Sequence, residues 1–177
     1  MSSSPDSLHA KLLEALEQSD TWRRQGRAER IMWLSQHQVA YGVISGPMDT
    51  MRVLAEARDC FVEAHYVATL VLAIAFIEHT LMDELQERKL DRGVRTLGIG
   101  IQRAAENNLF PSDLLSRAQQ LRKIRNPFSH RRAPGDPDSF GSRFLARSQH
   151  PDLILEADAK EALEVMYAFF RLTLRSA

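Results

Sequence analysis

The stretch HYVATLVLAIAFIEHTLMDELQE, residues 65–87, contains the most apolar part of the chain. From Val67 to Ile77 the only polar side chain is that of Thr69, so about three helical turns carry no polar face. A helix that is apolar all round is typical of one enclosed by its neighbours. The run is too short to span a bilayer. The stretch therefore predicts the buried central helix of an all-α bundle.

The segments before this central helix also repeat apolar residues at helical spacing. A first helix is expected from about Asp6 to Gln18, and a second helical segment over 20–38, where Gly26 is unfavourable. Residues 39–47 are expected to be irregular, with a boundary near Pro47. The next helix places five residues on one face: Met51, Leu54, Ala57, Phe61 and Ala64.

The segments after the central helix predict three further helices. The first covers residues 95–110, and Pro111 and Asp113 open the second, with an acid facing the helix dipole. RAPGDPDSFGS, residues 132–142, is predicted to be a loop. Asp158 and Glu161 have the spacing of a capping box and are expected to open the last helix. No segment has the pattern of a strand, so the fold class is all-α.

The composition of the chain excludes several classes of site. Its 177 residues are 44% apolar and 26% charged, with no net charge, as in an ordinary globular protein. Cys60 is the single cysteine, which excludes a disulfide or a cysteine metal site within one chain. No carboxylate cluster suggests a metal, so neither metal nor other cofactor is expected. The polar start lacks a signal-peptide core, and we expect a reducing, cytoplasmic setting without a membrane.

The stretch LRKIRNPFSHRR, residues 121–132, is the strongest candidate for a functional site. On a helical wheel Arg125 falls among the apolar side chains of Leu114, Ala118, Leu121, Ile124 and Phe128. A guanidinium there needs a carboxylate, a ligand or a subunit interface, because an unpaired buried charge loses its hydration. Glu78, which follows the apolar run of the central helix, is the candidate carboxylate.

His130 lies five positions after Arg125, about 140° away around a straight helix. A kink or helix end at Pro127 could bring the two side chains together. Charge in this region is uneven. From Leu114 to Arg147 there are eight cations and two anions, Asp136 and Asp138, so the local net charge is 8 − 2 = +6. The eight cations are Arg117, Arg122, Lys123, Arg125, Arg131, Arg132, Arg143 and Arg147. Such a patch suits a polyanion, although cations also favour helix ends and solvated faces.

The run Arg125 to His130, RNPFSH, resembles the Arg-x4-His motif of the HEPN (higher eukaryotes and prokaryotes nucleotide-binding) superfamily. The resemblance extends to three longer segments. Residues 61–85 are similar to the central helices of that superfamily, residues 109–130 to its motif helix, and residues 157–172 to its closing helix. It covers about 49–177, which we interpret as a HEPN-like helical domain, and leaves 1–48 as an N-terminal helical extension that it does not cover.

The resemblance implies a homodimer in which the two motifs meet, and for many members a metal-independent ribonuclease in toxin–antitoxin or phage-defence systems. It implies that Arg125 and His130 are the catalytic pair, with Asn126 and Glu78 in support. The flanking Arg122, Lys123, Arg131 and Arg132 would then contact nucleic acid. Arg132 stands where members with the fuller motif have a tyrosine.

The partners expected on this interpretation are a second copy of the chain, RNA or a nucleotide, and an antitoxin or other regulatory protein. Two alternatives stay open. One is a module of the same fold that binds RNA, a nucleotide or a partner without catalysis. The other is a helical protein-interaction subunit whose basic patch meets an acidic partner. Arg125 with Glu78 could also be a structural ion pair, and His130 a group at a helix end.

Overall fold

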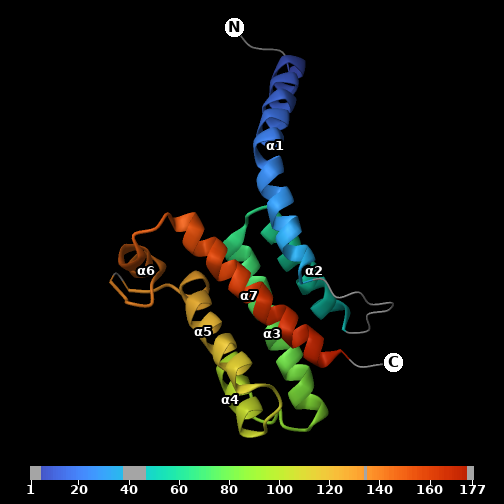
Figure 1. Ribbon diagram of the computed structural model, residues 1–177, viewed down its shortest axis with the longest axis vertical. Coiled ribbons are helices and arrows are strands. Elements are labelled where there is room, and N and C mark those ends of the chain that lie inside the picture. Colours follow the sequence, from blue (N-terminus) through green and yellow to red (C-terminus); the bar gives the residue numbers. More distant parts are fainter. Residues whose placement is uncertain (1–4, 38–46, 134, 175–177) are drawn as a thin grey trace. The chain divides into compact units, whose positions relative to one another are not determined.

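Figure 1 shows the computed structural model of the protein, which describes residues 5–37, 47–133 and 135–174. The described residues form seven helices and no strand, which confirms the all-α prediction. The chain divides into two units, residues 1–38 and 39–177. Residues 39–46, predicted to be irregular, lie outside the described residues. The predicted start of the second domain, residue 49, is the second residue of α2 (Met48–Val62).

The first unit contains one long helix, α1 (Pro5–Ser35). The expected break after Gln18 is wrong, because the helix continues through Asp20 and past Gly26. Residues 19–21 are weak helix formers, but none lacks a backbone N–H, so the hydrogen-bond ladder is not interrupted. Glycine costs about 1 kcal/mol relative to alanine inside a helix, which is too little to end a helix of this length.

In the second unit, α3 (Tyr66–Glu87) is the central helix, and it contacts α2, α4, α5 and α7. Leu70, Ala73, Leu81 and Leu85 are fully buried along it. Its neighbours α2 and α7 pack along its length, and Figure 1 shows α7 crossing in front of it.

The expectation that α3 is enclosed on all sides is wrong. Val67, Val71, Ala75 and Met82 follow one another along a single face of the helix, and all four are half-buried. The neighbouring helices leave this face partly open, and the adjoining sector, which carries His79, Asp83 and Gln86, is exposed. By length and composition α3 is the one described helix that could cross a membrane. The core helix of a folded protein meets the same criteria, and much of α3 is buried against other helices.

Three further helices complete the core. A hydrogen bond from Ile99 N to Thr96 Oγ1 caps α4 (Leu97–Glu106), and α5 (Ser112–Ser129) begins after Pro111. Both helices lie where the sequence predicts them. The third helix, α7 (Pro151–Thr173), packs against α3 and α5. Aromatic side chains fill the junctions, with the Phe110 and Phe169 ring centroids 4.7 Å apart.

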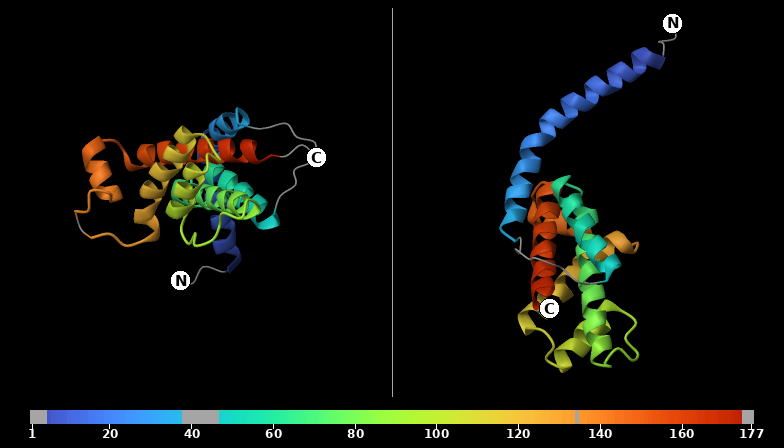
Figure 2. Two further views of the ribbon diagram at one scale, coloured as in Figure 1. Left: turned by 90° about the horizontal axis from the view of Figure 1, so that it is seen from below. Right: turned by 90° about the vertical axis from the view of Figure 1, so that its right-hand side faces the viewer.

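Two expectations for the C-terminal third of the chain are wrong. The predicted loop 132–142 ends in a short helix, α6 (Phe140–Arg147), because Ser139 caps it by accepting a hydrogen bond from Ser142 N. The last helix begins at Pro151 rather than near Asp158, since His150 Nδ1 caps its first turn by accepting from Asp152 N. Asp158 is therefore an interior residue of α7, and its side chain is buried. Figure 2 shows α6 at the edge of the second unit, near the start of α7.

Candidate nucleic-acid interface

The motif stretch forms the C-terminal part of α5, which continues through Pro127 and ends at Ser129. Proline has no N–H to give to the preceding turn, but near a helix end this removes a single bond. His130 N donates to Asn126 O at 2.8 Å, and the backbone of His130 is extended, with φ −139° and ψ 132°. The helix thus ends just before His130.

Arg125 is half-buried on α5, and its Nη1 donates to Ser129 Oγ at 3.3 Å. Its Nε is buried without a hydrogen-bond partner. Glu78, the predicted partner, is half-buried on α3, yet no hydrogen bond or ion pair joins it to Arg125 among the described residues. The guanidinium of Arg125 is therefore not neutralised by a carboxylate within the described part of one copy.

The side chain of His130 is exposed, and Asn126 is half-buried one turn before it. The described residues contain no hydrogen bond that links the side chains of Arg125 and His130. A single copy therefore brings Arg125 and His130 to the same end of α5 without joining them. If they act together, a ligand or a second copy has to connect them.

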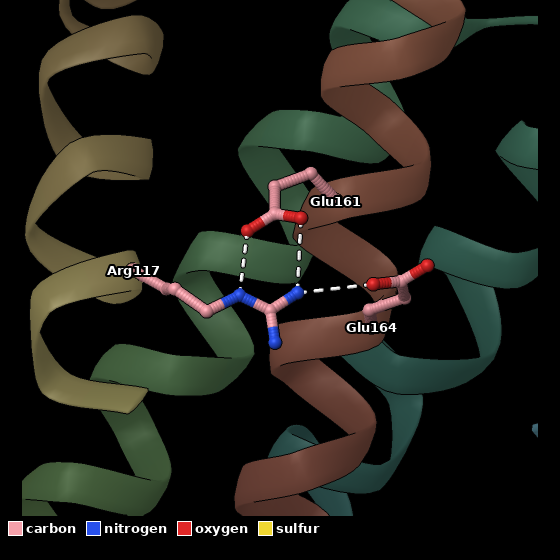
Figure 3. A network of polar contacts seen from close by, with 3 residues as sticks. All are labelled: Arg117, Glu161 and Glu164. Carbon is pink, nitrogen blue, oxygen red and sulfur yellow. Dashed lines mark hydrogen bonds and ion pairs between the residues drawn. The ribbon is translucent and has the colours of Figure 1, made fainter. Parts of the chain in front are cut away.

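The structure divides the eight cations of this region into two groups. The first group is paired with carboxylates. Arg117 donates to both oxygens of Glu161, at 2.7 and 2.9 Å, and to Glu164 at 3.0 Å (Figure 3). The hydrogen bond with Glu161 is the main reason that the pKa of Arg117 lies above its ordinary value. Arg117 therefore joins α5 to α7.

Two further cations belong to the paired group. Arg143 donates to both oxygens of Asp158 at 2.7 Å. Arg132 lies 3.7 Å from the carboxylate of Asp136. Of the four cations predicted to contact nucleic acid, Arg132 is thus the one with a nearby carboxylate in the described structure.

The second group makes no ion pair with any described residue. It consists of five of the eight cations: Arg122, Lys123, Arg125, Arg131 and Arg147. Lys123, Arg131 and Arg147 are exposed, whereas Arg122 is half-buried and lies over Gly98 of α4. Arg122 Nε donates to Gln119 at 3.2 Å, which does not neutralise it. We call these five residues the unpaired basic group.

Sequence patterns did not identify the carboxylates that pair with Arg117 and Arg143. Glu161, Glu164 and Asp158 are far along the chain, and only the packing of α7 brings them to α5 and α6. A partial signal existed, since Glu161 and Glu164 are three apart and lie on one helical face. The described residues contain no group of three His, Cys, Asp or Glu side chains placed to hold a metal ion.

No family model, curated protein or solved structure matches this chain.

Proposed function

We propose that the chain is a metal-independent endoribonuclease of the HEPN type that acts as a homodimer in a toxin–antitoxin or phage-defence system. The observation that carries the proposal is the unpaired basic group, four of whose members, the motif arginine Arg125 included, lie within residues 122–131, in the C-terminal part of α5 and just after it. A phosphodiester backbone would supply the negative charge that this group lacks within one chain. The second unit would be the HEPN-like domain, in a reducing, cytoplasmic setting.

In this mechanism Arg125 binds the scissile phosphate, because a guanidinium presents a planar fork of donors that matches phosphate oxygens. His130 transfers protons as the RNA 2′-hydroxyl attacks the neighbouring phosphorus, since imidazole gains and loses a proton near neutral pH. One imidazole cannot easily act as both base and acid. A two-fold dimer supplies two of them at one interface.

The half-buried apolar face of α3 supports the dimeric part of the proposal. Val67, Val71, Ala75 and Met82 would lose water in contact with a second copy, and apolar burial is the main driving force of such association. Glu78 follows on the same helix. In a dimer it could take the supporting role toward Arg125 that it does not take within one copy.

A second candidate is a non-catalytic module that binds RNA through the same cations. It is favoured by the exposed His130 side chain, whose ring has no hydrogen-bond partner among the described residues. Product formation separates the two candidates. The nuclease generates 2′,3′-cyclic phosphate ends in the presence of EDTA, whereas the module binds RNA and leaves it intact.

Both candidate functions require RNA binding, which is tested by measuring the affinity for RNA at several salt concentrations. Arg125→Ala should weaken binding and reduce the slope of log Kd against log salt by about 0.7, the value for one phosphate contact on a single strand. Arg117→Ala is the control, because Arg117 is already paired with Glu161 and Glu164. Equal loss of affinity in both variants would contradict a phosphate contact specific to Arg125.

A further inference from the structure

The helix α6 is attached to the rest of the second unit without an apolar face packed into the core. None of its eight residues is buried. Leu145 is 76% exposed and Phe144 is 36% exposed. Its main aromatic contact is at its first residue, where the Phe140 ring centroid lies 5.7 Å from that of Phe128 on α5. The remaining residues of α6 are therefore attached to the rest of the second unit mainly by polar contacts.

The strongest of these contacts is the ion pair between Arg143 and Asp158. Both carboxylate oxygens accept from Arg143 Nη2 at 2.7 Å, and the side chains of Arg143 and Asp158 are 15% and 5% exposed. A carboxylate buried to this extent needs a partner, because its hydration is lost. The pair thus fixes the middle of α6 to the second turn of α7.

Further hydrogen bonds connect α6 to the segment that follows the motif. Ser142 Oγ donates to Asp136 O at 2.8 Å, and Ser139 N donates to the same oxygen at 2.9 Å. The carboxylate of Asp136 lies 3.7 Å from Arg132 Nη1. Arg132 is two residues after His130. A continuous set of contacts therefore runs from Asp158 through α6 to the basic residues beside His130.

We propose that Asp158 is a positioning residue for the RNA site: through Arg143 it holds α6 in place, and α6 in turn holds the segment that carries His130, Arg131 and Arg132. This role rests on the proposed function, but the attachment of α6 by Asp158 and Arg143 does not depend on RNA. Release of α6 would free the Asp136 backbone from Ser142 and let the basic segment move away from the end of α5.

The structural part is tested by amide hydrogen exchange of the full chain. In Asp158→Asn we expect exchange of α6 amides to accelerate about tenfold or more, with the amides of α3 unchanged, because α6 opens as a local unit. Arg117→Gln is the control, since it breaks the contacts of Arg117 on α5 with Glu161 and Glu164 on α7 without touching α6. Should Asp158→Asn fail to fold, Arg143→Gln removes the positive charge that faces Asp158, and it should also speed exchange in α6. Unchanged protection of α6 in a folded variant would overturn the proposal.

The functional part is tested by RNA binding with the same proteins. Asp158→Asn should raise the Kd for single-stranded RNA, and Asp158→Asn combined with Arg143→Gln should raise it no further, because both changes break one contact. Free exchange of α6 with unaltered RNA affinity would overturn the positioning role. A wild-type protein that binds no RNA would instead refute the proposed function, and the exchange data would still decide whether Asp158 holds α6.

Discussion

Arg117 and Arg125 lie on the same helix but differ in whether a carboxylate pairs with them. They are eight residues apart on α5, and both belong to the basic region of the sequence. Arg117 faces α7, where Glu161 and Glu164 accept its hydrogen bonds. Arg125 lies near the end of the helix, where the described residues offer it Ser129 Oγ and no carboxylate. Counting charges along the sequence cannot separate these cases, because the pairing depends on which helix packs opposite.

Tyr167 allows a prediction about alkaline pH. It is buried on α7, and burial raises the pKa of its phenol above the ordinary value of 10.0, with partial opposition from Arg58. A folded-state pKa above the unfolded value means that the folded state holds the proton more tightly. The resulting stability is present below pH 10.0 and is lost as the pH rises through the folded-state pKa.

We therefore expect the free energy of unfolding to fall above pH 10.0, and to fall less steeply in Tyr167→Phe. Urea denaturation of both proteins below and above that pH measures the difference. The thiol of Cys60, whose pKa burial also raises, contributes the same slope to both. Identical pH dependence in the two proteins would contradict the burial of a protonated phenol at this position.

At the scale of elements, apolar periodicity located α2, α3, α4 and α5, because each places its apolar side chains on the core. Apolar periodicity could not locate a helix start that is set by a capping residue. Asp158 and Glu161 have capping spacing, yet His150 and Pro151 start α7 two turns earlier. The helix α6 was missed for a related reason. Its first three residues belong to the stretch 132–142, which is rich in Gly, Pro, Asp and Ser, and eight residues are too few to show a helical repeat.

The candidate site could be predicted from the sequence only in part, because the packing of the helices decides which charged side chains meet. The motif indicated Arg125 and His130 as site residues. The structure places Arg125 near the end of α5 and His130 directly after the helix. The ion pair between Arg125 and Glu78 was inferred from the cost of a buried charge, and it is absent among the described residues of one copy. Arg125 is half-buried rather than enclosed, so water or a ligand can still solvate it and the premise of full burial does not hold.

Two glycines of α4 give a matched test of its packing. A methyl group on Gly98 would lie 3.4 Å from the flexible end of Arg122, but on Gly100 it would lie 3.0 Å from Leu81 Cδ2, which is fully buried. Alanine gains up to about 1 kcal/mol of helix propensity at either position. Overpacking a core costs about 1–3 kcal/mol.

Gly98→Ala should therefore stabilise the protein slightly, and Gly100→Ala should destabilise it. Thermal or urea denaturation gives the difference between the two variants directly. A Gly100→Ala protein as stable as Gly98→Ala would mean that α4 and α3 are less tightly packed than the structure indicates.

For the whole molecule, the open face of α3 predicts association. An apolar face that is half-buried in one copy is best covered by the same face of another, as in an isologous dimer. Sedimentation or light scattering should give twice the chain mass, and Val71→Lys should shift the protein to monomers. Leu145→Lys is the control, because Leu145 is also apolar and exposed but belongs to α6 and not to α3. A monomeric wild type would contradict the composite site.

If Arg125 and His130 form a nuclease site, the motif at the end of α5 cleaves RNA without a metal. RNA cleavage is measured by incubating a labelled structured RNA with wild type, Arg125→Ala and His130→Ala in the presence of EDTA. We predict cleavage by the wild type alone, with 2′,3′-cyclic phosphate ends, while both variants remain folded and keep the same oligomeric state. Cleavage by all three proteins, or by none across several RNAs, would contradict catalysis by Arg125 and His130.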